Sequence, residues 1–482
     1  MRTGNHKRRD TLPLYQQVAD RVVELIESGA FKPGERLPSI RDLSRQQQVS
    51  INTAKEAYAL LEARRLLEAR PQSGFYVRAR LPAVPSEPEL RLPELNPIGV
   101  SISEMVRMIM RDVLNPQLVQ FGVALPNPQL LPAEKLSRML AGAARRHQAE
   151  SLAYAIPPGC EALRREIARR LLDAGCTLRP DEIIITTGCA EAVFLALRAV
   201  CRPGETVAIE SPVYFNFLQL IEELGLRALE IPSSPSEGMS LEALRYALGQ
   251  TKVSACVVIP NFNNPLGGQM PEERKRELVE LLASHDIPLI EDDIYGDLSF
   301  ADERPGVAKG HDRRGGVLLC SSFSKTLAPG YRVGWIAPGR FYAQVERLKM
   351  IHNIASAAPT QLAIAEFLAG GGYERHLRTI RRDYARRVAL MGEAIGRHFP
   401  AGTCVTRPRG GFTLWVELPG DVDTFALYRR ALQRGITLAP GPTFSASGRY
   451  RNCIRLNAAF WSGETEPALE TLGSLAGELV GE

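Results

Sequence analysis

Short apolar runs alternate with helical stretches through most of the sequence, and this alternation limits the possible folds more than any other feature. Five runs have the length and composition of buried strands: 182–186, 206–209, 255–259, 287–290 and 317–320. Helical periodicity marks stretches such as 161–174 and 191–200. Strands that alternate with helices predict a mostly parallel α/β sheet covered on both faces. Ligands of such sheets bind at the carboxyl ends of the strands.

The first 80 residues follow a different pattern, which predicts a separate small domain. Three stretches have helical periodicity: 15–26, 39–47 and 52–64. Two short strand-like runs follow, 66–70 and 75–77, with a turn signal at 71–74 between them. Three helices followed by a β-hairpin describe a winged helix-turn-helix of the α+β class.

This small domain is also the basic part of the chain. Residues 1–80 hold 15 Lys and Arg against 9 Asp and Glu, a charge of +6, whereas the whole chain carries +5. A basic head on a neutral body favours an anionic partner for the head. A solvated basic surface would give the same count, so charge alone does not decide between the two interpretations.

Residues 81–101 have the composition of a linker, with prolines at 82, 85, 88, 93 and 97. A segment of this kind is semi-extended and forms no core. At ~3 Å per residue, its roughly 20 residues would reach about 60 Å. We therefore expect a DNA-binding domain over 12–80, a linker over 81–101 and a body over 102–482.

The second helix of a helix-turn-helix pair lies in the major groove with its first residues at the base edges. In this chain the residues expected there are Ser50, Asn52, Thr53 and Lys55. The preceding helix offers two cations for DNA phosphates, Arg41 and Arg45. Gly74, at the tip of the wing, allows a close approach to the DNA backbone or minor groove.

The head resembles the GntR family of bacterial regulators over nearly its whole length, in segments such as GERLPSIRDLSRQQQVS. The sequence departs from the family pattern at two positions. Ile51 stands where an Arg is common, which removes one expected phosphate contact. Arg65 stands where a Gly usually ends the recognition helix.

A lysine in the serine-rich segment SSFSKTLAPGYR, residues 321–332, carries the candidate chemistry of the body. Lys325, in a loop after an apolar run, can bond to an aldehyde cofactor as a Schiff base. The hydroxyls of Ser322 and Ser324 and the guanidinium of Arg332 are groups that bind phosphate. A lone lysine among serines is more often a surface residue, so this interpretation depends on other segments.

Further segments place suitable groups at the ends of other predicted strands. Asn264 offers an amide to a pyridine hydroxyl. Asp292 offers a carboxylate to a protonated ring nitrogen, and Tyr295 lies three residues further on, within reach of the ring oxygen. Residues 187–191 open a helix whose N–H groups would face a phosphate. Tyr214 could stack on an aromatic ring.

From about residue 120 to the C-terminus, these segments resemble the fold type I pyridoxal 5'-phosphate enzymes of the class I aminotransferase group. The resemblance implies that Lys325 bonds to the cofactor, that Asp292 pairs with its ring nitrogen, and that Asn264 and Tyr295 bind its ring oxygen. It implies a phosphate cup formed by Gly188, Cys189, Ala190, Ser322 and Arg332. By the same match Tyr154 reaches the phosphate of the neighbouring subunit in a homodimer, and Arg455 grips the α-carboxylate of a substrate.

A GntR-like head joined by a proline-rich linker to an aminotransferase-like body is the arrangement of the MocR subfamily of transcription regulators. This resemblance implies a pyridoxal phosphate-dependent regulator that binds a double-stranded DNA operator and senses a small amino compound, or the cofactor itself. A working aminotransferase that carries a DNA-binding head is the alternative. No residue needed for transamination is visibly missing, because Lys325 could also serve as the general base.

The sequence also indicates what the chain does not contain. No apolar run approaches the ~20 residues that span a bilayer, and no secretory apolar segment follows the basic N-terminus. We therefore expect a cytoplasmic protein with no membrane partner. The eight cysteines form no C-x-x-C pair and the histidines lack metal-ligand spacing, so no metal site is expected.

Overall fold

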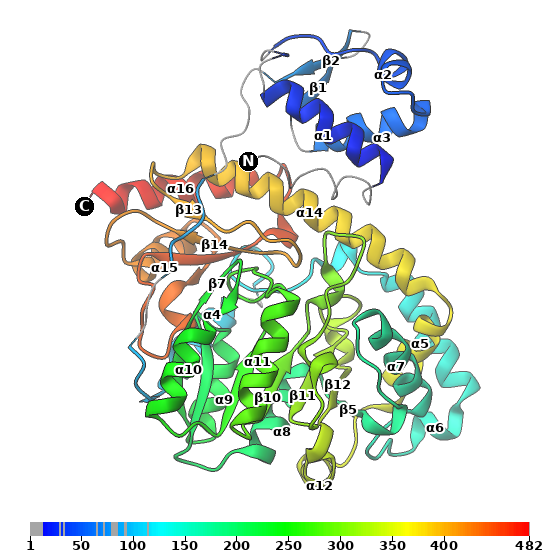
Figure 1. Cartoon of the computed structure of the whole chain (residues 1–482), viewed down its shortest axis with the longest axis vertical. Helices are drawn as coiled ribbons and strands as arrows, with labels where there is room; N and C mark the ends of the chain where they lie inside the picture. Colours follow the sequence, from blue (N-terminus) through cyan, green and yellow to red (C-terminus); the bar gives the residue numbers. More distant parts are fainter. Residues whose placement is uncertain are drawn as a thin grey trace. The chain divides into compact units, whose positions relative to one another are not determined.

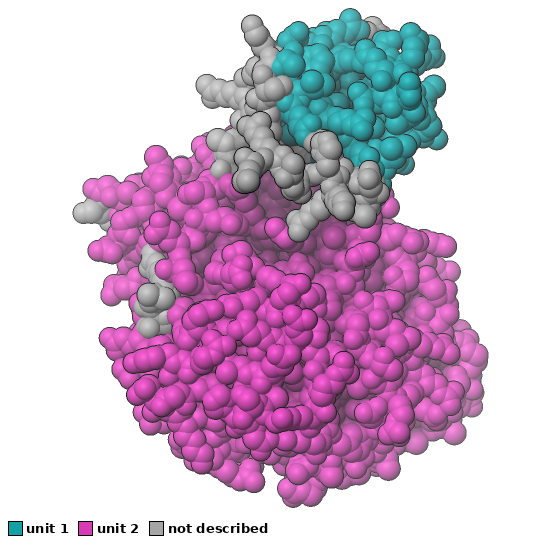
Figure 2. All heavy atoms as spheres, viewed as in Figure 1, with its two compact units in different colours: residues 1–84 teal, residues 85–482 magenta. Residues whose placement is uncertain are grey.

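The computed structural model describes residues 13–27, 30–31, 34–63, 66–70, 73–78, 85–90, 94–112 and 115–481. The chain divides into two compact units, residues 1–84 and 85–482 (Figure 2). Each unit has a hydrophobic core of its own. Among the described residues, no helix is long and apolar enough to cross a membrane.

The first unit contains the elements of a winged helix-turn-helix. They are α1 (Leu14–Glu27), α2 (Ile40–Gln46), α3 (Ile51–Ala63) and the antiparallel strands β1 (Leu67–Arg70) and β2 (Gly74–Val77). Ser39 caps α2, and the backbone N–H of Thr53 donates to the Ser50 hydroxyl (3.0 Å) to cap α3. Val22, Leu43 and Tyr58 belong to its core. The predicted turn at residues 71–72 and Arg65 lie outside the described residues.

The second unit is built on a mixed sheet in the order β3-β7-β6-β9-β10-β11-β12-β5, with β8 added to β7. Its strands are β3 (Ile98–Gly99), β5 (Ile184–Thr186), β6 (Thr206–Ser211), β7 (Arg227–Ser234), β8 (Gly238–Met239), β9 (Ala255–Val258), β10 (Leu289–Asp292), β11 (Val317–Ser322) and β12 (Gly334–Ala337). Five neighbouring strands of this sheet are parallel, as predicted: β7, β6, β9, β10 and β11. Strand β12 is antiparallel to both of its neighbours, which makes the sheet mixed.

Helices cover both faces of this sheet (Figure 1). One face packs against α8 (Cys189–Val200) and α9 (Phe215–Glu223), through Ala196 and Leu218 among others. The other face packs against α10 (Leu241–Gln250) and α11 (Glu272–Ser284), through Leu244 and Leu278 among others. Burial on both faces explains why the strands read as continuous apolar runs.

Further helices surround the sheet and lead to a smaller lobe. They are α4 (Ser103–Asp112), α5 (Ala133–Arg146), α6 (Gln148–Leu152), α7 (Glu161–Asp173), α12 (Tyr342–Asn353), α13 (Ala358–Ala369) and α14 (Gly372–His398). The first half of α14 packs in the core of the large lobe through Leu377, and its second half packs in the core of the small lobe through Met391. This long helix therefore joins the two lobes (Figure 1).

The small lobe contains an antiparallel sheet in the order β13-β14-β17-β16. Its elements are β13 (Cys404–Val405), β14 (Thr413–Glu417), α15 (Thr424–Gln433), β16 (Ala439–Pro440), β17 (Cys453–Asn457) and α16 (Glu466–Gly481). A separate parallel pair, β4 (Val119–Gln120) with β15 (Ile436–Thr437), brings the chain after residue 118 to this lobe.

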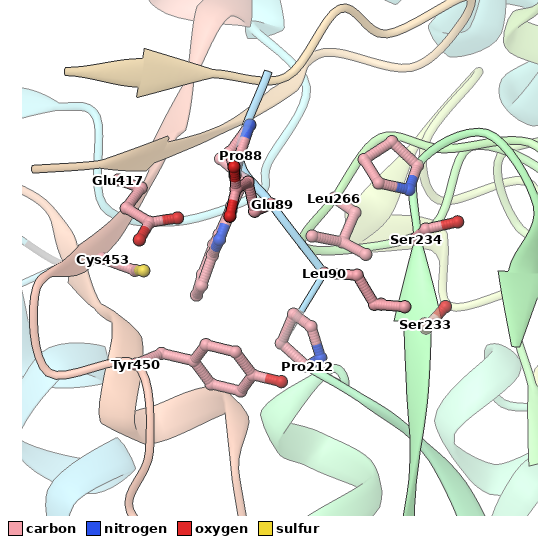
Figure 3. Close-up of a pocket in the computed structure, with 12 residues that line it drawn as sticks. Pro88, Glu89, Leu90, Pro212, Ser233, Ser234, Leu266, Glu417, Tyr450 and Cys453 are labelled. Atoms are coloured by element: carbon pink, nitrogen blue, oxygen red, sulfur yellow. The ribbon is translucent and has the colours of Figure 1, made fainter. Parts of the chain in front are cut away.

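Residues 85–90, here called the strap, lie against the second unit. The backbone N–H of Val405 donates to the carbonyl of Ser86 (2.8 Å), and that of Arg407 donates to the Glu87 carboxylate (3.0 Å). The strap then borders a cavity of about 30 Å³ (Figure 3), whose other walls come from the large lobe at Pro212 and the small lobe at Tyr450. Proline content keeps the strap extended, and its carbonyls still accept hydrogen bonds from the small lobe.

Candidate functional site

Lys325 lies in the loop after β11, at the carboxyl end of the sheet, as the sequence predicts. Its Nζ donates to the carbonyl of Ala124 (2.6 Å) and lies 5.8 Å from the centre of the Tyr295 ring. Burial, aided by the positive charge of Arg455, lowers the pKa of Lys325 to about 8. At pH 7 about a tenth of this amine is therefore neutral and nucleophilic, far more than for an ordinary lysine.

Asp292 ends β10, the strand beside β11. Its carboxylate is buried and accepts from the backbone N–H of Ile294 (3.0 Å) and from the Cys189 thiol (3.3 Å). Burial outweighs these hydrogen bonds and raises the pKa of Asp292 to about 6. A cation placed against this carboxylate would relieve the cost of burying its charge.

Arg455, on β17 of the small lobe, is fully buried beside the same cluster. Its guanidinium donates to the side-chain oxygen of Asn264 (3.3 Å) and to the carbonyl of Gly122. Among the described residues, no carboxylate acts on the pKa of Arg455 or pairs with it, and its Nε has no hydrogen-bond partner. Burial without a counter-charge lowers the pKa of Arg455 to about 10. The site therefore contains a cation with unused capacity for an anion.

Tyr295 adds a second buried polar group with unused capacity. Its hydroxyl lies beside Asn264 but makes no hydrogen bond of normal geometry with the described residues. Burial raises the pKa of this hydroxyl, so it stays protonated at any physiological pH. Buried hydroxyls are normally hydrogen-bonded, and an orphaned one facing a site points to a missing acceptor.

A second part of the site is formed where α8 begins. Gly188 precedes the helix with φ 81° and ψ 173°, a conformation almost restricted to glycine, and Cys189 is its first residue. A Cβ on Gly188 would collide with the guanidinium of Arg332. The Arg332 guanidinium, which is exposed, donates to the carbonyl of Thr187 (3.2 Å). Free helix N–H groups and a guanidinium thus face the same space, where Ala190 is exposed.

The serines of the lysine loop support this arrangement. The backbone N–H of Ser324 donates to the Ser322 hydroxyl (3.3 Å), which holds the turn that carries Lys325. The guanidinium of Arg332 donates to the Ser324 hydroxyl (3.5 Å). Both hydroxyls therefore lie next to the groups at the start of α8, although Ser322 is the last residue of β11 rather than part of a loop.

Two predicted tyrosines occupy different positions. Tyr214, just before α9, lies among the cluster, because Arg455, Asp292, Cys189 and Arg332 all act on its pKa, which burial raises to about 12. Tyr154, by contrast, is 78% exposed, and its neighbours in sequence Leu152 and Ile156 are also exposed, at 90% and 52%. Within one chain it does not join the cluster, so its expected role toward a neighbouring subunit stays a prediction.

Sequence reasoning missed the segment 121–125, which closes the site from the small lobe. The carbonyls of Gly122 and Ala124 accept from Arg455 and Lys325, the two cations described above. Asn457 holds the segment in place by donating to the carbonyls of Val123 (2.6 Å) and Leu125 (2.8 Å). The segment meets the cations through backbone carbonyls, and the apolar sequence FGVAL gives no signal of such contacts.

The predicted DNA-contacting residues lie on the surface of the first unit. Asn52 and Lys55 are exposed on α3, where Thr53 is half-buried. On α2, Arg41 is exposed, and the Arg45 side chain is 82% exposed, 3.9 Å from Asp42.

Gly74, with φ +109°, begins the second strand of the wing. The guanidinium of Arg36 lies where a Cβ on Gly74 would point. Arg36 is an exposed cation at the wing that sequence reasoning did not single out.

Two family models match the sequence: "Aminotransferase class I and II" over residues 129–472 and "Bacterial regulatory proteins, gntR family" over residues 14–77. The chain is 40% identical over 460 residues to the uncharacterized HTH-type transcriptional regulator YjiR of Escherichia coli K12, which covers 95% of this chain and 98% of that protein. It is 39% identical to YdcR of the same organism, another uncharacterized HTH-type transcriptional regulator, over 96% of this chain and 99% of that protein.

Solved structures of aminotransferases are similar to the body of the chain. LysN, an α-aminoadipate aminotransferase of Thermus thermophilus complexed with N-(5'-phosphopyridoxyl)-L-leucine, is 29% identical with a TM-score of 0.72. That match covers 78% of this chain and 95% of LysN. The kynurenine aminotransferase of Pyrococcus horikoshii is 30% identical with a TM-score of 0.72, over 78% of this chain and 94% of that one. The regulators therefore match nearly the whole chain, and the enzymes match about three-quarters of it.

Proposed function

The chain belongs to the aminotransferase class I and II family and carries a gntR-family region ahead of it, and from this premise we propose that it is a DNA-binding transcription regulator that senses an amino compound. The observation that carries the proposal is that the chain contains both the gntR-family region and the aminotransferase-like body. Relatives named as transcriptional regulators match through the head and the body, and the body keeps the clustered Lys325, Asp292 and Arg455. An enzyme has no use for a wing and a recognition helix.

The cofactor of this family is pyridoxal 5'-phosphate, and the residues of the site fit it. The orphaned Tyr295 hydroxyl would bind a ring oxygen, and the first N–H groups of α8, beside the Arg332 guanidinium that packs against Gly188, would bind a phosphate. When bound, the cofactor supplies an aldehyde that amines capture reversibly and a ring that withdraws electrons. Lys325 would offer its neutral amine to that aldehyde, and Asp292 would hold a proton on the ring nitrogen.

The remaining residues of the site position the same group. We assign the phosphate to the N–H groups of Gly188, Cys189 and Ala190 together with Arg332, Ser322 and Ser324, the ring oxygen to Asn264 and Tyr295, and one ring face to Tyr214. The positive end of the α8 dipole and the Arg332 guanidinium both favour a dianion at this point. Cys189 donates its thiol to Asp292, so only its backbone N–H is available to the phosphate.

Arg455 determines the class of effector that fits. It is a buried cation that interacts only with neutral acceptors in the described structure, and a carboxylate from outside would give it the missing counter-charge. Guanidinium and carboxylate pair in a bidentate manner, which fixes orientation as well as affinity. We therefore propose an effector that carries both an amine for the Lys325 position and a carboxylate for Arg455, which is an amino acid.

The proposed regulator acts as a homodimer on a double-stranded operator. The exposed Tyr154, Leu152 and Ile156 provide an apolar surface for a second copy, and two bodies supply two heads. Asn52 is placed to read bases, whereas Lys55 is placed to bind phosphate. Because its target is DNA, we place the protein in the cytoplasm, with no membrane partner.

The second candidate function is transamination. The similarity to LysN and the presence of Lys325 as a possible general base favour it. The two functions differ in what they do with an amino acid and a keto acid together. A transaminase releases a new keto acid at every turnover, whereas a sensor only changes its absorption spectrum and its affinity for DNA.

The deciding experiment follows the visible spectrum of the purified protein during titration with a panel of amino acids, in parallel with a gel shift on its own upstream DNA. The amine that shifts the spectrum should also change DNA affinity, and adding a keto acid should release no product. Sustained product release without an effect on DNA would favour the enzyme. Borohydride reduction and peptide mapping should label Lys325, and the label should be lost in Lys325→Ala but kept in Lys252→Ala, which alters an exposed lysine.

A further inference from the structure

A buried ion pair lies directly behind the start of α8, outside the residues assigned above. Lys349, on α12, places its Nζ 2.7 Å from the carboxylate of Glu191 in the first turn of α8. The two side chains are only 1% and 7% exposed. Removing two charges from water is costly, so a pair at this depth calls for a physical explanation.

The pair is part of a closed ring of hydrogen bonds around Thr187, the residue before Gly188. The Glu191 carboxylate accepts from the backbone N–H of Thr187 (2.6 Å). Lys349 donates to the Ser356 hydroxyl (2.8 Å), which lies 3.2 Å from the Thr187 hydroxyl. The side chain of Asn353 completes the ring by donating to Glu191 and to the Thr187 hydroxyl (3.3 Å). The backbone N–H and the hydroxyl of Thr187 are therefore both fixed by hydrogen bonds.

The other side of Thr187 faces the expected phosphate position. Its carbonyl accepts from Arg332 (3.2 Å), the cation assigned to the phosphate. The ring thus determines where this carbonyl points, and the carbonyl helps to hold the Arg332 guanidinium over Gly188. A change at Lys349 would reach the phosphate position through Glu191, Thr187 and Arg332 in turn.

The charge of Glu191 raises a second issue. A carboxylate in the first turn of a helix is attracted by the positive helix end, the same feature that attracts a phosphate. Left unpaired, the carboxylate would repel a phosphate dianion at that end through a medium of low dielectric constant. Lys349 cancels this charge from the buried side, and its own burial lowers its pKa while Glu191 acts to raise it.

We propose that Lys349 is a positioning residue for the cofactor phosphate: paired with Glu191, it fixes Thr187 and neutralises the carboxylate in the first turn of α8. The proposal depends on the proposed function only in that the Lys325 site takes pyridoxal phosphate. It predicts an effect confined to the phosphate. The aldehyde end of the cofactor, at Lys325, should not be affected by the pair.

The test compares two ligands that share the aldehyde and ring and differ in the phosphate. Dissociation constants for pyridoxal phosphate and for pyridoxal are measured by absorbance for the wild type, Lys349→Met, Glu191→Gln and the double variant. Lys349→Met should weaken pyridoxal phosphate roughly 10- to 100-fold, the range of a lost charge-assisted hydrogen bond, and pyridoxal less than threefold. The double variant should recover most of that loss, because the unpaired carboxylate is gone, and Lys349→Arg should stay close to the wild type.

Lys275 provides the matched control, since it is a fully buried lysine that pairs with a glutamate, Glu272, at 2.7 Å. Lys275→Met should lower the melting temperature without changing the ratio of the two dissociation constants. Equal losses for both ligands in Lys349→Met, or a double variant as weak as that single variant, would overturn the proposal. If Lys349→Met does not fold, the ligand ratio in Lys349→Gln and in the double variant decides in the same way. A wild type that binds neither ligand would instead contradict the proposed function.

Discussion

Replacing Arg455 with methionine should abolish the response to amino acids at almost no cost in stability. Replacing most buried cations lowers the stability of a protein strongly, because they neutralise buried carboxylates. Arg304 offers the comparison within the same unit: it is 11% exposed and donates to Asp293 and to Asp297 (2.7 Å). Arg455 is more deeply buried and donates only to neutral acceptors in the described structure.

The magnitudes can be worked from these contacts. A pKa lowered from 12.5 to about 10 means that the charged form of Arg455, the form present at pH 7, costs roughly 3 kcal/mol in the folded chain. Arg455→Met removes that cost and also removes two hydrogen bonds from a charged donor, worth about 1.5 kcal/mol each at the lower end of the range for such bonds. The two effects nearly cancel. Arg304→Met leaves the buried Asp293 carboxylate without its ion-pair partner, whereas Asp297 keeps Arg170 at 3.2 Å; breaking a buried pair in this way costs about 3–5 kcal/mol.

Calorimetry of the cofactor-free protein measures the difference. With an unfolding entropy of about 2.1 cal/mol/K per residue over roughly 400 residues, 1 kcal/mol shifts the melting temperature by about 1 °C. Arg455→Met should melt within about 1 °C of the wild type, and Arg304→Met should melt about 3–6 °C lower. In spectral titrations Arg455→Met should still respond to simple amines and lose its response to amino acids.

Two results would refute this reasoning. Destabilisation of Arg455→Met to the level of Arg304→Met would show that Arg455 is a structural cation. Equal loss of the responses to amines and amino acids would show that Arg455 does not recognise a carboxylate.

Three further predictions concern other parts of the chain. Gly188→Ala should weaken the binding of pyridoxal phosphate at least tenfold, because the added Cβ displaces Arg332. Gly204→Ala is the control, since Gly204 has φ +86° with open space around it, and this variant should keep the wild-type affinity. Equal affinities of the two variants would contradict the assigned phosphate cup. The rate of cofactor capture by Lys325 should rise roughly tenfold from pH 7 to pH 9 and then level off, since its pKa of about 8 makes the amine neutral over that range. A rate that still rises about sevenfold between pH 9 and pH 10 would show an ordinary lysine. In gel shifts, Lys55→Ala should reduce the salt dependence of DNA binding by about one unit, and Asn52→Ala should change base preference, so identical effects of the two would argue against their separate roles.

The sequence predicts the positions of Lys325, Asp292 and Asn264 well, for a reason that lies in the sheet. Each follows or ends a strand buried on both faces, such strands read as unbroken apolar runs, and the carboxyl ends of parallel strands lie on one edge. All five predicted runs are strands in the structure. The order of helices and hairpin in the head is equally readable, because caps and turns carry local signals.

The pattern fails where a strand is not a continuous apolar run. β7 contains Glu230, which is buried because Ser211 and Ser447 donate to it, and β12 is a short antiparallel strand that begins with Gly334. Neither satisfies the rule that found the other strands. In both cases the stabilising partners are distant in sequence, so local periodicity contains no sign of them.

Contacts between helix faces are also beyond sequence reasoning. Helical periodicity separates buried from exposed faces, but it does not show that Lys349 meets a glutamate 158 residues away. A buried lysine on an otherwise ordinary helix reads as a surface residue. The contacts of Gly122 and Ala124 are still less visible, because they involve only backbone carbonyls.

The strap determines how far a DNA-binding head can be from its body. Since residues 85–90 are held by Val405 and Arg407 (Figure 3 shows their far end at Leu90), only residues 79–84 separate the described end of the wing from a fixed anchor. Seven Cα–Cα steps span at most about 25 Å, less than half of the roughly 60 Å expected for a free linker. One turn of B-DNA measures about 34–36 Å. In the proposed dimer, residues 79–84 of each subunit limit the distance between the two half-sites that the heads can bind together. Half-sites farther apart than this limit can be bound together only if the DNA bends, so the flexibility of the operator becomes part of what this protein recognises.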